Sequence, residues 1–266
     1  LVTVFVSSHA GGQVPPKPGG LVQRTEATRT VADPTDWSTV AAKAHDAAAA
    51  AVEGWQQQVR LQGKIMGPNL LVTPGGLTGP SLEPMMSARM LSAGVHAPTA
   101  AKFARVFAAA WKKWQDAYTV PGLPVYPAFA AWPTAQAPPV PNVPWVVGSG
   151  PSSQMAALTP GPLRSALKAE VPQASPEADK AIEAFANFAS ASFAVWLATA
   201  QFALVLGKGS VPSYAPPVVP VGPVVAGDIL QTNAVVLGSF GSTGDALLSF
   251  EALLGAWKVK LESGKA

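Results

Sequence analysis

The sequence contains no cysteine, and this absence excludes several kinds of chemistry. A disulfide scaffold, a catalytic thiol and a thiolate metal site all require cysteine. Histidine is also scarce, with only His9, His45 and His96. None has a second histidine or a carboxylate at metal-ligand spacing, and Asp46 points away from its neighbour His45 on a helix. We therefore interpret all three as surface histidines and expect no metal site.

Charge is the second shortage. Charged residues make up 12% of the 266 residues, against roughly 25% in ordinary soluble domains, and the mean hydropathy is +0.25. Because scattered surface charge keeps monomers apart, we expect much of the surface to be buried against other subunits or against lipid. The net charge is only +3, and Lys112 and Lys113 are the only adjacent basic pair, so nucleic-acid binding is not expected.

Recognisable catalytic motifs are also missing. The sequence has no G-x-S-x-G elbow, no Walker-type loop and no G-x-G-x-x-G fingerprint. Its best glycine loop, residues 238–245, leads into a predicted helix, where an anion could bind. No lysine follows, and Asp245 adds negative charge, so we interpret the loop as a turn and a cap. We expect no catalytic residues, no cofactor and a non-enzymatic protein.

What the sequence does have is a long run without charge. Residues 117–163 contain no Asp, Glu, Lys, Arg or His and are rich in proline. Proline at this density excludes a helix or a central strand and favours extended, turning chain. An uncharged aromatic segment needs cover, its own chain is short of material to cover it, and we expect neighbouring subunits to do so. The contact residues expected here and in a second proline-valine loop are Tyr126, Phe129, Trp132, Trp145, Val146, Val147, Tyr214, Val218 and Val219.

Around these loops the pattern is mainly helical. Helices are predicted over residues 37–62, 85–93, 98–118, 164–168, 176–206 and 245–262, and short strands over 70–73 and within 228–240. In the third helix the aromatic residues recur at spacings of 4, 4, 3 and 4 and define one face, namely Phe103, Phe107, Trp111, Trp114 and Tyr118. Five tryptophans fall on predicted helices, which is typical of a core, namely Trp55, Trp111, Trp114, Trp196 and Trp257.

Residues 184–207 form 24 uncharged positions, long enough to span a membrane. Polar residues interrupt this stretch, including Asn187, Ser192 and Gln201, and alanine supplies most of its apolar content. We favour a helix buried in the centre of the protein. Association with a membrane is the alternative.

Four short matches in the same order indicate an internal duplication. Thr73-Pro-Gly recurs as Thr159-Pro-Gly, and Pro98 with Phe107 recurs as Pro176 with Phe185 at the same offset. Val-Pro follows each long helix, and a Pro-Pro-Val loop follows each Val-Pro. We expect two copies of one unit, consisting of a TPG turn, a short helix, a long helix and a proline-valine loop.

The predicted fold is therefore mainly α, an imperfect tandem duplication of a helical unit with long ordered proline-rich loops and little β-structure. The expected parts are an N-terminal arm (1–35), a first repeat (36–150), a second repeat (151–227) and a C-terminal strand and helix (228–266). The arm is either a loose terminus or a segment laid across a neighbour. No signal peptide is evident in the first residues.

The expected function is that of a structural subunit of a large homo-oligomeric assembly, most of all a virion or phage-tail-like particle. Its partners would be copies of itself and other structural proteins of the same particle. The alternatives are a membrane-associated protein using residues 184–207, and an enzyme or ligand-binding protein with its site at a subunit boundary.

Overall fold

The computed structural model describes residues 35–66, 70–73, 76–127, 136–171, 175–210, 225–229 and 235–241. The chain divides into two units between Pro34 and Thr35, and every described residue belongs to the second unit. The predicted arm, apart from Thr35, and the predicted helix 245–262 lie outside the described residues.

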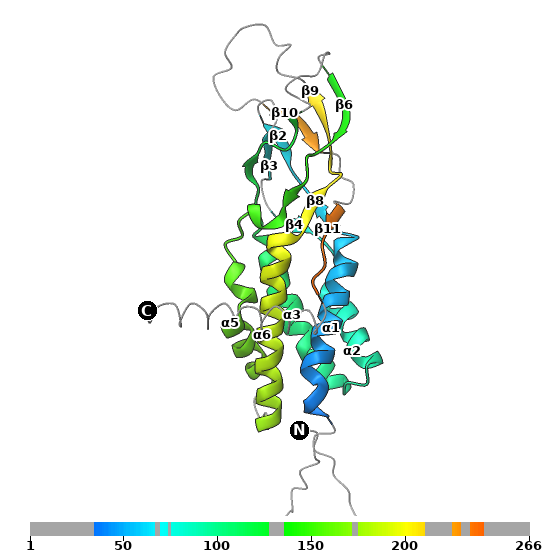
Figure 1. The fold of residues 1–266 in the computed structure, drawn as a ribbon, viewed down its shortest axis with the longest axis vertical. Helices are drawn as coiled ribbons and strands as arrows, with labels where there is room; N and C mark the ends of the chain where they lie inside the picture. The colour runs from blue at the N-terminus through cyan, green and yellow to red at the C-terminus, as the bar shows by residue number, and fades with distance from the viewer. Residues whose placement is uncertain are drawn as a thin grey trace, which may run out of the picture. The chain divides into compact units, whose positions relative to one another are not determined.

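The described part of the chain is mainly helical, as predicted (Figure 1). Its helices are α1 (Trp37–Gln56), α2 (Leu82–Ser92), α3 (Ala97–Asp116), α5 (Pro160–Glu170) and α6 (Pro176–Thr199), with short 3-10 turns η1 (Val147–Ser149) and η2 (Met155–Leu158). Local chemistry sets their starts. Side-chain oxygens of Asp36, Ser81 and Ser175 accept hydrogen bonds from first-turn amides, and α3, α5 and α6 each carry proline in the first turn.

A cluster of aromatic rings forms the centre of the helical region. Trp111 lies 5.2 Å from Trp55, 5.0 Å from Trp114 and 5.2 Å from Trp196, measured between ring centroids. All four tryptophans are essentially inaccessible to solvent. The prediction that the helical tryptophans form a core is confirmed for these four, whereas Trp257 lies outside the described residues.

The strands lie at one end of the helices and amount to more β-structure than predicted (Figure 1). An antiparallel six-stranded sheet has the order β5-β3-β2-β10-β9-β6, and a three-stranded sheet has the order β11-β8-β7. A third, two-stranded sheet pairs β1 with β4. The strand bounds are β1 (Arg60–Leu61), β2 (Lys64–Met66), β3 (Leu70–Val72), β4 (Leu77–Thr78), β5 (Pro121–Leu123), β6 (Gln136–Pro141), β7 (Trp145–Val146), β8 (Gln201–Ala203), β9 (Leu206–Ser210), β10 (Val225–Ile229) and β11 (Val235–Leu237).

The proline-rich strands occupy the edges of the large sheet. β5 and β6 are its two outermost strands, and the pairing of β6 with β9 shifts register between Ala137 and Val140, around two prolines. Proline has no backbone N–H to donate to a neighbouring strand, so a sheet tolerates it at its edges and at bulges. Distant pairing explains the missed sheet, because β6 pairs with β9, and β2 pairs with β10 as well as with its neighbour β3, so that both β6 and β2 have a partner beyond residue 205.

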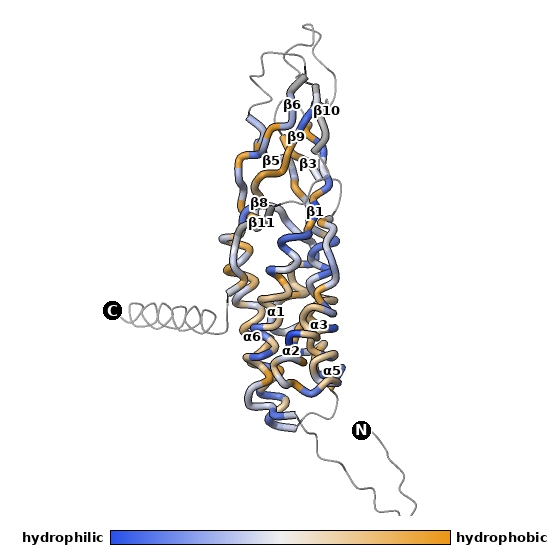
Figure 2. Tube along the Cα trace, turned by 90° about the vertical axis from the view of Figure 1, so that its right-hand side faces the viewer, coloured by the Kyte–Doolittle hydropathy of each residue, from blue (hydrophilic) through white to orange (hydrophobic). Residues whose placement is uncertain are grey.

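The same pairing corrects the predicted helix 176–206. α6 ends at Thr199, and the chain continues as β8 and β9, which pair with β7 and β6. α6 is long and apolar enough to cross a membrane by length and composition, and 44% of its most apolar window is buried within the chain. Figure 2 shows hydrophilic positions recurring along the helices, while the strand region includes long apolar stretches.

Candidate functional site

The structure describes four of the nine predicted contact residues. Tyr126, Trp145 and Val147 are at most 6% exposed, and Val146 is half-buried. The chain itself therefore covers these three, because strands that follow α6 supply the cover. The ring of Trp145, for example, lies 5.1 Å from that of Phe202.

The other five predicted contact residues lie outside the described residues, namely Phe129, Trp132, Tyr214, Val218 and Val219. Whether any of the nine contacts another subunit stays a prediction.

Trp145 lies in one of two strand pairings that follow each other along the chain; we call the two together the ribbon, and the residues between them, 142–144 and 204–205, the bend. β6 pairs with β9, with Pro141 opposite Leu206, and β7 pairs with β8, with Trp145 opposite Phe202. The two pairings share one register: from Pro141 to Trp145 is four residues forward, and from Leu206 to Phe202 is four residues back. That register sets Val143 opposite Leu204, in the gap between the two pairings.

The side chain of Asn142 fixes this bend. It is 6% exposed, and its Oδ1 accepts a hydrogen bond from the amide of Val205 at 2.7 Å. Its Nδ2 donates to the carbonyl of Val143 at 2.7 Å and to that of Phe202 at 3.1 Å. The Tyr126 hydroxyl donates to the carbonyl of Val205 at 3.0 Å. The Val205 amide thus has a side-chain acceptor, and the Val205 carbonyl accepts from the Asn142 backbone amide at 3.1 Å as well as from Tyr126.

At the bend the ribbon exposes two apolar side chains. Leu204 is 60% exposed and Val143 is 51% exposed. Leu204 also has φ of +57°, and it is the only non-glycine residue with positive φ among those described. A left-handed conformation costs an L-residue about 1–2 kcal/mol, and strain of this kind often marks functional positions. Neither residue could be recognised from the sequence, because neither its exposure nor its φ follows from a local pattern here.

Two buried tyrosines, Tyr118 and Tyr126, donate hydrogen bonds to backbone carbonyls in or next to the ribbon. The Tyr118 hydroxyl donates to the carbonyl of Val147 at 3.0 Å. Burial raises the pKa of Tyr118 to about 12 and also raises the pKa of Tyr126. The cause is the cost of placing a phenolate away from water. Both hydroxyls therefore act as neutral donors at physiological pH.

His45 is buried, which corrects its prediction as a surface histidine. It is 0% exposed, and its Nε2 lies 2.8 Å from the Ser192 hydroxyl oxygen. The centroid of its ring is 6.1 Å from that of Phe188 and 6.2 Å from that of Phe240. The Oδ1 of Asp46 is 3.9 Å from its Nδ1. A histidine-serine pair can activate a nucleophile. Here both side chains are enclosed, and the hydrogen bond joins α1 to α6 through the core.

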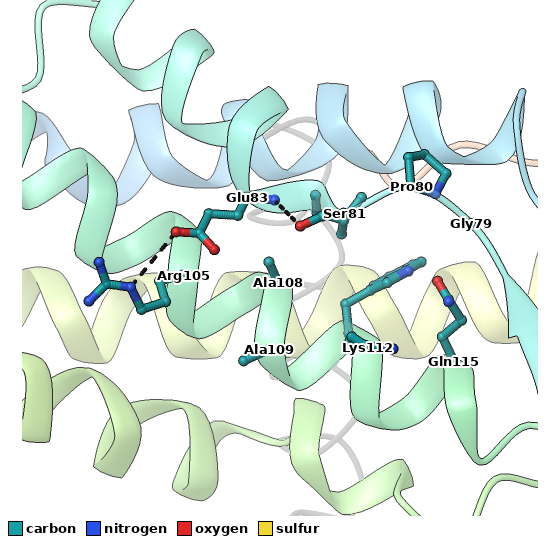
Figure 3. Close-up of a pocket in the computed structure, with 11 residues that line it drawn as sticks. Gly79, Pro80, Ser81, Glu83, Arg105, Ala108, Ala109, Lys112 and Gln115 are labelled. Atoms are coloured by element: carbon teal, nitrogen blue, oxygen red, sulfur yellow. Dashed lines mark hydrogen bonds and ion pairs between the residues drawn. The ribbon is translucent and has the colours of Figure 1, made fainter.

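Two clefts flank α3 and share Arg105. The first, of about 330 Å³, lies between α3 and the start of α2, and Figure 3 shows Glu83 and Arg105 meeting beside it. The second, of about 380 Å³, lies between α3 and α5. Arg105 Nε is 3.7 Å from Glu83 Oε1, and its Nη1 is 3.4 Å from Glu170 Oε2. These exposed ion pairs neutralise Arg105, which is the only arginine among the described residues that line either cleft.

Among the described residues no three His, Cys, Asp or Glu side chains gather as metal ligands would. Of the glycine loop 238–245, the structure describes the first four residues, and Phe240 of this loop is buried. No protein-family model, no curated protein and no solved structure matches this chain.

Proposed function

We propose that this chain is a non-enzymatic structural subunit that assembles with copies of itself, and that the bent ribbon forms a contact between subunits. The observation that carries the proposal is the pair Val143 and Leu204. Two apolar side chains lie opposite each other at an exposed bend, one of them in a strained conformation.

The free-energy cost of leucine at position 204 favours a role in binding. Glycine or asparagine at position 204 would adopt the left-handed conformation at lower cost. Leucine costs more and also leaves apolar area in water, at about 25 cal/mol per Å². Burial of this side chain in a neighbour would offset both costs.

The surrounding ribbon suits a fixed contact surface. Residues 118–163 carry no charge, so no charged group on this segment needs to be desolvated on association. Asn142 and Tyr126 hold the bend rigid, which lowers the entropy lost on binding. The extension of this proposal to a virion or phage-tail-like particle, with other structural proteins as partners, draws on the predicted arm and loops.

The buried His45–Ser192 pair supports a structural role. Phe188 and Phe240 enclose it, and a hydrogen bond between two buried polar groups stabilises a helix contact without any ligand.

The test replaces Leu204 with Asn, which tolerates positive φ and removes the apolar surface. We expect Leu204→Asn to unfold at the same or higher temperature than the parent but to assemble less, measured by light scattering on a sizing column. Leu91→Gln is the matched control, since Leu91 is 46% exposed on α2, far along the chain from the ribbon. A parent protein that elutes as a 27.2 kDa monomer would overturn the proposed function.

We further propose that the helix pairs α2–α3 and α5–α6 are copies of one unit. α2 and α5 have the same length, 11 residues, and start 78 positions apart, the offset that also separates Pro98 from Pro176. The rings of Phe107 and Phe185, also 78 apart, lie 6.0 Å from each other, as equivalent residues do near a pseudo-twofold axis. The TPG sequences do not support it, because Thr73 follows β3 whereas Thr159 precedes α5.

A further inference from the structure

We infer that the α2–α3 cleft binds a small organic carboxylate, consisting of a short aliphatic chain with a carboxylate at one end. The inference goes beyond the proposed function and does not depend on it. The observation that carries it is the side-chain amide of Gln115, which is buried at this cleft and uses only one of its two ends.

The amide of Gln115 presents an unpaired donor. Gln115 is 6% exposed, lines the cleft and reaches from α3 toward the Gly79–Pro80 segment (Figure 3). Its Oε1 accepts a hydrogen bond from Nε1 of Trp55 at 2.7 Å. Because an indole N–H can only donate, this bond fixes which end of the amide carries the oxygen. Nε2 is therefore the other end, and it donates to no group of the described residues. A buried donor of this kind needs an acceptor, which a ligand in the cleft can supply.

Other positive groups lie near this donor. Lys112 lies three residues before Gln115 on α3, and α2 begins just after Ser81, across the cleft (Figure 3). The N-terminus of a helix carries a partial positive charge. The Nζ of Lys112 also binds Asp116 Oδ2 at 2.7 Å, but this pair is exposed and is screened by solvent. An acceptor with negative charge is therefore favoured over a neutral one.

An ion pair occupies the opposite end of the cleft. Arg105 Nε is 3.7 Å from Glu83 Oε1, and Figure 3 shows this pair at the end away from Gln115. Glu83 is the only acidic residue among the described residues that line the cleft. Because Arg105 matches its charge, an anion beside Gln115 meets no unpaired carboxylate.

The wall between the two ends is apolar. Leu82, Ala108 and Trp111 line it and are buried. Ala108 lies seven residues before Gln115, about 10 Å along the helix, which suits a chain of about six carbons. The cleft volume of about 330 Å³ is at the small end of the range for ligand pockets. The aliphatic part of the ligand would lie on this wall, with its carboxylate at Gln115.

Saturation-transfer NMR on the full-length protein tests the inference, with hexanoate as the probe and 1-hexanol as its uncharged counterpart. We expect hexanoate to bind with a Kd of about 1 mM or below. Hexanol should bind at least about tenfold more weakly, because hydrogen bonds to a charged acceptor are the stronger ones.

Two variants locate the site. Gln115→Glu keeps an acceptor for Trp55 and replaces only the donor, so hexanoate affinity should fall at least about tenfold. Ala109→Phe fills the cleft from an exposed position outside the core and should abolish binding. The matched control is Asn187→Asp, which adds the same charge at an exposed position on α6 that lines neither cleft. The control should bind hexanoate as the parent does.

Three outcomes would overturn the inference. Hexanoate binding that both cleft variants leave unchanged would exclude the cleft as the site. Equal affinities for hexanoate and hexanol would exclude recognition of a carboxylate. No saturation transfer to hexanoate at about 10 mM would exclude the ligand class as a whole. None of these results concerns the mass of the particle, so the proposed function is decided separately by light scattering.

Discussion

The helical bundle and the bent ribbon are stabilised by different means. The helical bundle, made of α1, α2, α3, α5 and α6, is stabilised mainly by contacts between side chains. Tryptophan rings fill its centre, and ion pairs such as Lys168–Asp179 at 3.1 Å link α5 to α6. In the ribbon, backbone groups are held by a few buried polar side chains, above all Asn142. The difference teaches that an uncharged, proline-rich segment can be ordered by its own chain once distant strands pair with it.

The comparison predicts that removing a ring costs more in the bundle than in the ribbon. Trp111→Ala should lower the free energy of unfolding by about 3–5 kcal/mol, because the cavity lies among three other tryptophans. Trp145→Ala should cost less, since it contacts Phe202 in a small sheet. Chemical denaturation measures both, and equal losses would contradict the comparison.

Trp145 is also a poor reporter of assembly. Because it is 6% exposed, its replacement changes the stability of the single chain as well as any contact with a neighbour. Leu204 is the better position for this test, since 60% of it is exposed and its replacement removes few contacts with the described part of the chain.

Alkaline pH should weaken the ribbon. The folded-state pKa of Tyr118 is about 12, above the unfolded value near 10, so its contribution is fully present below pH 10 and is lost as pH rises from 10 to 12. Each unit of difference corresponds to about 1.4 kcal/mol. Unfolding followed by absorbance at 295 nm should show the phenolates of Tyr118 and Tyr126 appearing together with loss of structure. Ionisation of both near pH 10 in the folded protein would refute the prediction.

Removing the side-chain amide of Asn142 should lower the stability of the bend. Asn142→Ala leaves the amide of Val205 and the carbonyl of Phe202 without this partner, at a cost of about 2 kcal/mol. Hydrogen exchange should rise for β8 and β9 and stay unchanged in α1. Uniform acceleration across the chain would mean that the ribbon and the bundle unfold as one unit.

The smallest effect is expected at the bundle surface. Arg105→Gln removes ion pairs to Glu83 and Glu170, but Arg105 is 56% exposed, so solvent screens both. We expect a loss below about 1 kcal/mol, which salt should reduce further. Thermal unfolding at low and high salt provides the measurement, and a loss as large as that of Asn142→Ala would reverse the ranking.

The amino-acid sequence by itself determined the helices and their core. The spacing of Phe103, Phe107, Trp111 and Trp114 defines one helical face, and caps such as Asp36 lie within a few residues of the groups they bind. Such signals are local, so they can be recognised in a single stretch of chain.

Only the tertiary structure decided where the proline-rich run goes and what it exposes. β6 depends on β9, about 70 residues away, and Leu204 takes positive φ because Asn142 holds the chain on either side of it. His45 is buried for a similar reason, since Ser192 and Phe240 reach it from α6 and from beyond β11. Pairing and burial between distant segments leave no periodic mark in either segment, so they follow only from the folded chain.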